Sequence, residues 1–194
     1  MSNSSNNIYK NLGTRNPPEK VREVDDFYAT DPIAAKLLLQ NEKLYNVWEC
    51  ACGKGHLSEV FKDAGVLGIS SDKVDRGYGI TINFLNEERV WRGDIVTNPP
   101  YKYASEFIEK AISLVEGGSK VCMFLKIQFL EGKKRKELFK KYPPKTIYVS
   151  SSKILCAKNA EFERMKSGGG GVVAYAWFVW EKGFSGDPVV KWIN

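Results

Sequence analysis

The sequence predicts an α/β domain in which a mostly parallel sheet carries helices on both faces and an antiparallel strand at one edge. Three observations predict it. Short apolar segments typical of strands alternate with segments whose apolar residues have helical spacing. Two of the strand-like segments continue directly into turns rich in glycine or proline. The last two strand-like segments have no helix between them, which favours an antiparallel pair at the sheet edge.

The helices are predicted from apolar residues that share one face and from residues that start or stop a helix. Asp31-Pro32 indicates a start, because aspartate accepts hydrogen bonds from free amides and proline fits the first helical position. Pro143-Pro144 indicates a stop. The predicted helices are residues 33–40, 56–64, 104–115 and 133–141.

The strands are predicted from short apolar runs bounded by turn residues. Residues 121–127 form the most apolar run, as expected for a strand buried on both faces. The full set is 47–52, 66–71, 80–83, 94–97, 121–127, 146–150 and 172–180. Because ligands of such sheets bind beyond the carboxyl ends of the strands, functional residues are expected there.

Length and composition favour one soluble, cytoplasmic domain. For a chain of 194 residues we expect a flexible segment over 1–24, rich in Ser, Asn, Lys and Pro, and a single domain over 25–194. The apolar runs are too short to cross a bilayer, and the polar start lacks the pattern of a signal peptide. The cysteines lack the paired spacing of a zinc site, so we expect buried free thiols and no metal.

The formal net charge is +6, and the excess is concentrated in residues 133–141, which hold six Lys or Arg. A basic face of this kind fits contacts with phosphates. A solvated helix face explains the same pattern, and charge alone leaves both readings open.

The first strand-to-helix turn contains Gly53 and Gly55, which permit a tight turn and a close approach of a ligand to the backbone. Asp72 ends the next strand, where its carboxylate can accept hydrogen bonds from two ribose hydroxyls. Ser58 stands where the dinucleotide fingerprint has its third glycine, which argues against a nicotinamide cofactor. Glu49 suits the ammonium group of a methionine-containing ligand. The alternative is a turn whose glycines serve only the backbone.

The second turn, Asn98-Pro99-Pro100-Tyr101, follows a predicted strand. Two prolines fix two φ angles and remove two amide donors, so the turn presents oxygen acceptors in a set geometry. The Asn98 side-chain oxygen and the Pro99 carbonyl can accept both N–H groups of an exocyclic amino group and favour a pyramidal nitrogen. Tyr101 can stack on the ring. The turn predicts methyl transfer to an amino nitrogen; the alternative is a merely rigid turn.

With these two turns in this order, the chain resembles the amino-group DNA methyltransferases, chiefly the N6-adenine enzymes. The resemblance implies a Rossmann-like class I fold with a seven-stranded sheet. It also implies the cofactor S-adenosyl-L-methionine, with S-adenosyl-L-homocysteine as product. Residues 27–32 look like the family segment over the methionine end of the cofactor. Asn83-Phe84 resembles an Asp-Phe pair near the cofactor adenine, although Asn replaces Asp, which puts the amino contact there in doubt. Residues 170–183 are similar to the last strand of compact phage and prophage-type enzymes, which implies an orphan enzyme of a bacterial host or a phage-infected cell.

The candidate residues follow from the two turns and the resemblance. The cofactor-binding candidates are Tyr28, Thr30, Glu49, Cys50, Ala51, Gly53, Gly55, Asp72, Asn83, Phe84 and Asn98. The catalytic candidates are Asn98, Pro99, Pro100 and Tyr101. The substrate-binding candidates are Tyr101, Lys126, Lys133, Lys134 and Arg135.

DNA is the partner that the resemblance implies, with the target adenine flipped out of the duplex or supplied single-stranded. The basic candidates follow the fifth strand, at the sheet edge of the catalytic turn, and would contact the DNA backbone. Larger relatives carry a target-recognition domain, for which this chain has no room. Residues 151–171 are predicted to form a loop, which is either a substrate loop or a plain surface loop. The target sequence and the oligomeric state stay open.

Three other functions remain as alternatives. The same tetrapeptide occurs in RNA adenine methyltransferases and in enzymes that methylate glutamine amides of proteins. The latter usually carry a helical N-terminal domain, which residues 1–46 cannot supply. The third alternative is a non-catalytic nucleic-acid-binding module with the same fold. The intact catalytic turn and Asp72 speak against it.

Overall fold

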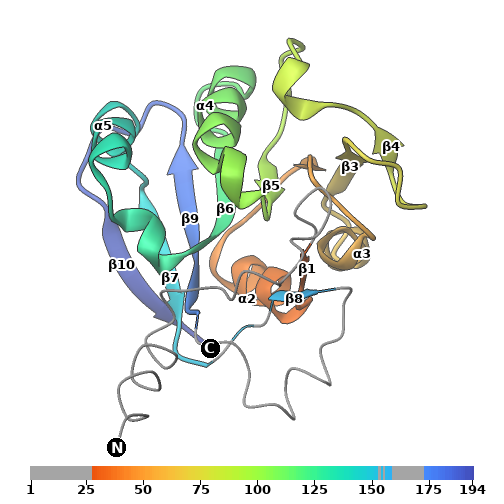
Figure 1. The fold of residues 1–194 in the computed structure, drawn as a ribbon, viewed down its shortest axis with the longest axis horizontal. Coiled ribbons are helices and arrows are strands. Elements are labelled where there is room, and N and C mark those ends of the chain that lie inside the picture. Colours follow the sequence, from red (N-terminus) through yellow and green to blue (C-terminus); the bar gives the residue numbers. More distant parts are fainter. Residues whose placement is uncertain (1–27, 153, 155, 159–172) are drawn as a thin grey trace, which may run out of the picture.

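The structure is a computed structural model that describes residues 28–152, 154, 156–158 and 173–194 (Figure 1). The segment at 1–24 that we predict to be flexible lies outside these residues. Most of the predicted loop at 151–171 also lies outside them.

The central sheet has eight strands, one more than the predicted seven. They are β2 (Val47–Glu49), β3 (Leu67–Asp72), β4 (Ile80–Thr81), β5 (Ile95–Thr97), β6 (Lys120–Lys126), β7 (Thr146–Ser150), β9 (Tyr175–Glu181) and β10 (Val189–Ile193). Their order across the sheet is β10-β7-β9-β6-β5-β2-β3-β4. Neighbouring strands are parallel, except that β9 is antiparallel to β6 and to β7. The predicted fold class and the antiparallel pairing of the closing strands are confirmed.

The predicted edge position of the antiparallel strand is wrong, because β10 lies outside β7 and occupies that edge. β10 runs parallel to β7, with Val189 opposite Thr146. Ile193 is the one buried residue of this strand, and the other four are exposed. The strand has no alternation of buried and exposed positions, so its sequence carries no alternating pattern that would have predicted an additional strand.

In the described part of the chain, α-helices cover both faces of the sheet (Figure 1). They are α2 (Ile33–Asn41), α3 (His56–Asp63), α4 (Ala104–Leu114) and α5 (Lys133–Lys141), as predicted to within one residue. Cys122 and Phe124 of β6 pack with α2 and α3, whereas Met123 packs with α4, because successive strand residues point to opposite faces. None of the helices within the described ranges is long and apolar enough to cross a membrane.

A separate two-stranded sheet joins segments that lie far apart in the chain. β1 (Tyr28–Thr30) is antiparallel to β8 (Cys156–Lys158), and Thr30 lies opposite Cys156 (Figure 1). The prediction of a loop over 151–171 is therefore wrong for residues 156–158. Each strand is only three residues long and is stabilised by a distant partner, so its own sequence carries no strand pattern.

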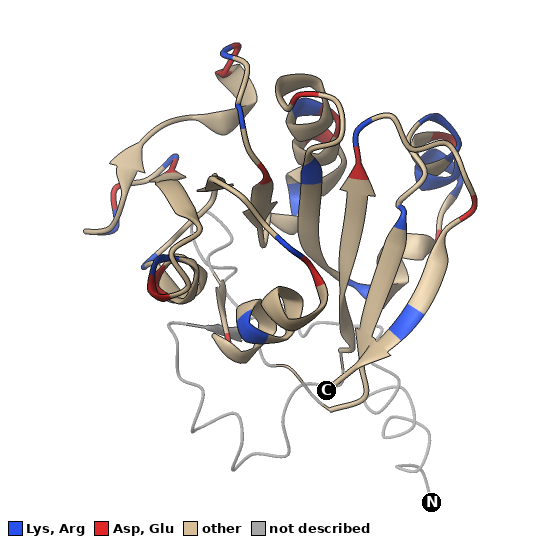
Figure 2. Cartoon of the chain, turned by 180° about the vertical axis from the view of Figure 1, so that it is seen from behind, with Lys and Arg blue, Asp and Glu red and all other residues tan. Residues whose placement is uncertain are grey.

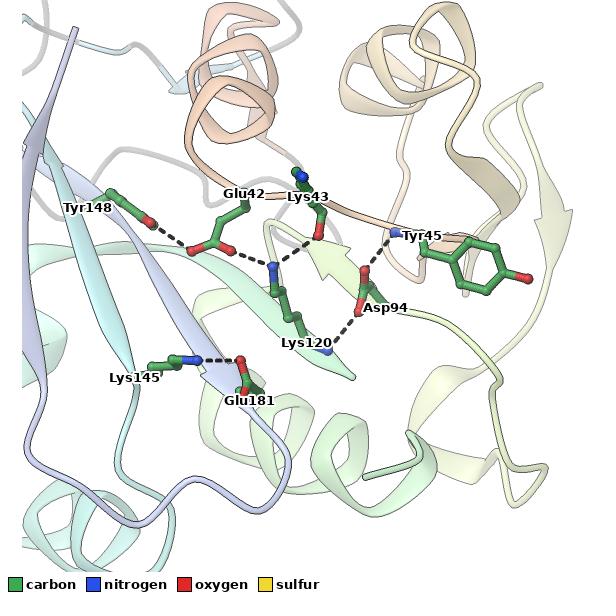
Figure 3. A network of polar contacts seen from close by, with 8 residues as sticks. All are labelled: Glu42, Lys43, Tyr45, Asp94, Lys120, Lys145, Tyr148 and Glu181. Atoms are coloured by element: carbon green, nitrogen blue, oxygen red, sulfur yellow. Dashed lines mark hydrogen bonds and ion pairs between the residues drawn. The ribbon is translucent and has the colours of Figure 1, made fainter. Parts of the chain in front are cut away.

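A polar network holds the amino ends of β5 and β6 against the segment after α2 (Figure 3). Glu42 accepts hydrogen bonds from the Tyr148 hydroxyl at 2.7 Å and from Lys120 Nζ at 2.6 Å. The buried carboxylate of Asp94 accepts hydrogen bonds from the backbone N–H groups of Tyr45 and Lys120, both at 2.7 Å. These contacts set the position of the two strands whose opposite ends carry functional candidates.

The variant Asp94→Ala is expected to lower the free energy of unfolding by roughly 2–4 kcal/mol, because two buried backbone donors lose their acceptor. Lys145→Ala is the control, since it removes the partly exposed ion pair with Glu181 and should cost below about 1 kcal/mol. Urea unfolding measures both changes. Equal losses in the two variants would show that Asp94 does not anchor the strands.

Candidate functional site

The predicted turns meet at one edge of the sheet. β3, β2, β5 and β6 are consecutive and parallel, so their carboxyl ends lie side by side. Asp72 ends β3, Glu49 ends β2, and Asn98 and Lys126 stand at the ends of β5 and β6. The topology therefore brings both turns and one basic residue into a single row.

The glycine turn is tied to the end of β3. Gly53 and Gly55 have φ of +55° and +83°, a region that favours glycine. The Gly53 N–H donates to Asp72 Oδ2 at 2.9 Å, and the Val74 N–H donates to Asp72 Oδ1 at 2.9 Å. The half-buried Asp72 carboxylate is thus held at the turn, where each oxygen keeps a second lone pair for a ligand.

Tyr78 lies against this turn. A Cβ atom added at Gly55 would come within 2.5 Å of the Tyr78 ring, so a side chain there would displace the ring. The Tyr78 hydroxyl donates to Glu59 Oε1 at 2.7 Å. Burial, followed by the hydrogen bond to Glu59, raises the pKa of Tyr78 to about 12. Position 55 must therefore be glycine to leave room for the Tyr78 ring beside the turn.

Glu49 is 2% exposed and points into a chain of hydroxyl groups. Ser58 Oγ donates to Glu49 Oε2, and Ser70 Oγ donates to Ser58 Oγ at 2.7 Å. Burial raises the pKa of Glu49 to about 8, more than the hydrogen bonds from the Ser58 side chain and backbone lower it, and the nearby charge of Asp72 raises it further. The serine that departs from the dinucleotide fingerprint therefore positions this carboxyl group.

The amide of Asn98 is held at one end and left unpaired at the other. Its Nδ2 donates to Thr30 Oγ1 at 2.8 Å and lies 3.8 Å from Cys156 Sγ. Its Oδ1 is buried and has no hydrogen-bond partner among the residues that the structure describes. A buried acceptor without a partner costs roughly 1–3 kcal/mol, so this oxygen is a marked candidate for contact with a ligand.

Tyr101 belongs to an aromatic group beside Asn98. Its ring centroid lies 6.4 Å from that of Tyr28 and 6.3 Å from that of Tyr175, and its hydroxyl donates to the Tyr175 hydroxyl at 3.0 Å. Lys126 Nζ lies 4.5 Å from the Tyr101 ring centroid. Burial keeps the pKa of Tyr101 far above its usual value, so the hydroxyl stays protonated at neutral pH.

Some predicted cofactor residues have side chains in the core. Cys50 and Phe84 are each 1% exposed, and Phe84 packs edge-on against Trp48 with ring centroids 5.3 Å apart. A ligand at these positions would meet the backbone rather than the side chain. Ala51 is partly buried against the same core, and Asn83 is half-buried at the start of the short helical turn that holds Phe84.

The basic candidates differ in their surroundings. Lys133 and Lys134 are exposed at the start of α5. Arg135 is half-buried and donates to the carbonyl oxygens of Gln128 and Glu131 at 2.7 and 2.9 Å. It therefore helps to hold the turn after β6. An open groove of about 470 Å³ lies beside this turn, and its lining residues are Ile127, Gln128, Leu130, Glu131 and Ala174.

Sequence reasoning missed four residues of the site: Ser58 as the partner of Glu49, Tyr78, Cys156 and Tyr175. The places of Tyr78, Cys156 and Tyr175 depend on contacts between separate segments, whereas Ser58 belongs to the same strand-turn-helix unit as Glu49. Within the described ranges, no three His, Cys, Asp or Glu side chains are grouped so as to hold a metal ion.

No protein-family model and no curated protein matches this sequence. Solved structures do share its fold. A Listeria monocytogenes protein assigned to the class I S-adenosylmethionine-dependent methyltransferases is 14% identical, with a TM-score of 0.55 over 82% of this chain and 62% of its own. The type I restriction-modification methyltransferase subunit of Streptococcus thermophilus is 11% identical, with a TM-score of 0.60 over 86% of this chain and 47% of its own.

The M protein of the type I restriction enzyme EcoKI is 16% identical, with a TM-score of 0.54 over 84% of this chain and 45% of its own. The chain thus spans less than two thirds of the length of each of these three proteins. At such identities the likeness shows the fold alone. That fold is the Rossmann-like fold of class I S-adenosylmethionine-dependent methyltransferases.

Proposed function

We propose that this chain transfers a methyl group from S-adenosyl-L-methionine to the exocyclic N6 of adenine in DNA. The observation that carries the proposal is Asn98 Oδ1, a buried acceptor without a partner in the described part of the chain, at the carboxyl end of a parallel strand. An amino group is the ligand chemistry that such an acceptor fits, because its N–H groups are donors.

The residues at the glycine turn fit the proposed cofactor. Gly53 and Gly55 form the tight turn, and the Asp72 carboxylate, held by the Gly53 N–H, has the chemistry to accept hydrogen bonds from two ribose hydroxyls. Glu49, in its charged form, pairs with the ammonium group of the methionine moiety. When bound, S-adenosyl-L-methionine supplies a methyl group on a positively charged sulfur. Thr30 of β1 contacts Asn98, and Tyr28 lies against Tyr101, so β1 would border the site.

The catalytic turn acts on the amino nitrogen. Asn98 Oδ1 and the Pro99 carbonyl accept its two N–H groups and direct its lone pair towards the methyl group. Tyr101 stacks on the adenine ring and, through Tyr175, keeps its own orientation. No strong base is required, because the amino proton becomes acidic once the nitrogen is alkylated. The raised pKa of Tyr101 is consistent with a holding role and not with proton removal.

DNA is the proposed polymer because the basic candidates border the same edge. Figure 2 shows Lys and Arg gathered on α5, whose start follows the carboxyl end of β6. Two of the structures with the same fold are methyltransferase components of type I restriction enzymes. Lys126, Lys133 and Lys134 would contact phosphates while the flipped adenine reaches Asn98 and Tyr101.

The proposal is tested by transfer of tritiated methyl groups to DNA, RNA and protein, followed by digestion of the labelled product. Label recovered as N6-methyladenine from DNA is the expected result. Label in RNA or in glutamine side chains would keep the chemistry and replace the substrate. The absence of transfer to all three, with cofactor binding intact, would favour a non-catalytic binding module.

Removal of Lys133 and Lys134 together is expected to weaken binding to DNA of any sequence by a similar factor. The slope of log affinity against log salt concentration should become shallower by about 1–2, because two phosphate contacts are lost. Fluorescence anisotropy over a salt series measures this slope. The control is Lys140→Ala with Lys141→Ala, which removes the same charge at the opposite end of α5. Equal slopes for both double variants would contradict a DNA contact at the start of α5.

A further inference from the structure

The two-stranded sheet of β1 and β8 places two side chains on the Asn98 amide. Thr30 and Cys156 lie opposite each other in its register, and they are 4% and 8% exposed. Thr30 Oγ1 lies 2.8 Å from Asn98 Nδ2, and Cys156 Sγ lies 3.8 Å from the same atom. Both partners therefore contact the nitrogen end of the amide and leave the oxygen end free.

This arrangement decides which end of the amide faces a substrate. An asparagine amide can rotate by half a turn, which exchanges its acceptor oxygen and its donor nitrogen with little change of shape. A donor nitrogen turned towards an amino group would place donor against donor. Because Thr30 is buried, water does not readily replace its hydroxyl as the acceptor for Nδ2. Thr30 supplies the acceptor at ordinary hydrogen-bond distance, whereas the thiol of Cys156 is a weak one.

We propose that Thr30 is a positioning residue that holds the Asn98 amide with its oxygen towards the substrate amino group. This role rests on the proposed function, and it differs from the cofactor contact that the sequence predicts for Thr30. A cofactor contact would act on cofactor affinity. A positioning contact acts on kcat, because the orientation of the Asn98 amide affects the substrate nitrogen during methyl transfer and does not affect the cofactor.

The test compares Thr30→Val with Thr30→Ser in the full chain. Valine keeps the shape and removes the acceptor, whereas serine keeps the acceptor. Thr30→Val should lower kcat for methyl transfer to DNA about 10- to 100-fold, the usual range for residues that orient a functional group. The Kd for S-adenosyl-L-methionine should stay within about twofold, and Thr30→Ser should regain most of kcat. Thr146→Val is the control, since Thr146 is also buried but lies at the amino end of β7.

A second readout does not depend on activity. The side-chain amide protons of Asn98, followed by NMR in nitrogen-15-labelled protein, should be protected from exchange in the wild type and in Thr30→Ser. They should lose this protection in Thr30→Val.

Three results would overturn the inference: wild-type kcat in Thr30→Val, a loss of kcat that Thr30→Ser does not regain, or unchanged protection of the Asn98 amide. A wild-type chain with a protected Asn98 amide and no methyl transfer to DNA, RNA or protein would instead overturn the proposed function, and the positioning role with it.

Discussion

Replacement of Asn98 by alanine should abolish methyl transfer, with kcat reduced by roughly 10³-fold, and should leave the affinity for S-adenosyl-L-methionine close to that of the wild type. The loss removes the acceptor that holds the amino nitrogen in its reactive geometry, and single preorganised groups of this kind are worth roughly 10²–10³ in kcat. The removed oxygen has no partner in the described part of the chain, and the removed nitrogen gives up its hydrogen bond to Thr30, so folding should lose roughly 1–3 kcal/mol. Single-turnover transfer of labelled methyl groups and calorimetric titration of the cofactor measure the two quantities.

Asn98→Asp is the matched variant for this experiment. It keeps an acceptor of the same shape, and the Thr30 hydroxyl, which lies 2.8 Å from Asn98 Nδ2, can donate to the carboxylate in place of accepting from the amide. We therefore expect Asn98→Asp to retain more activity than Asn98→Ala. If Asn98→Ala kept a tenth or more of the wild-type rate, the proposed mechanism would be wrong.

The affinity for S-adenosyl-L-methionine should depend on pH through Glu49 and be greatest near pH 8. Burial raises the pKa of Glu49 to about 8, so below that pH the carboxyl group must lose a proton before it can pair with the cofactor ammonium. Affinity should then fall by up to about tenfold per pH unit as the solution is acidified. Above about pH 8 the ammonium loses its own proton, since α-amino groups titrate at about 7.7–8.0.

Glu49→Gln should remove the acid limb of this profile and lower the maximal affinity, because glutamine binds the ammonium without titrating. Calorimetric titrations between pH 6 and pH 9 measure both effects, and Glu59→Gln is a control with an exposed carboxylate on α3. Parallel profiles for the wild type and Glu49→Gln would exclude Glu49 as the group that titrates.

The same group affects folding without cofactor. The pKa of Glu49 is raised in the folded state, so its favourable contribution to stability is complete below the unfolded value of 4.5. It is lost as the pH rises from there to about 8. Glu49→Gln should therefore unfold at a higher temperature than the wild type at pH 8, and the difference should shrink towards pH 4.5. A constant difference across this range would contradict a buried, titrating Glu49.

Local patterns were sufficient for the helices and for the two turns. The span of α5 agrees with the predicted 133–141 because the two prolines that follow it cannot continue the helix. β10 and β8 escaped prediction because an exposed edge strand and a three-residue strand have no burial pattern of their own. The site positions of Tyr78 and Tyr175 were not predicted for a related reason. Tyr78 contacts Gly55, and Tyr175 contacts Tyr101, from other segments of the chain.

The sequence by itself determined that Asn98-Pro99-Pro100-Tyr101 and the glycine turn follow strands, and parallel strands bring such turns to one edge. Only the tertiary structure decided which end of the Asn98 amide is paired, since Thr30 and Cys156 reach it through a sheet built from distant segments. It also decided the protonation of Glu49, because burial depends on the packing of the whole domain. Hydrogen bonds and desolvation of this kind act through space, and the order of residues along the chain does not specify them.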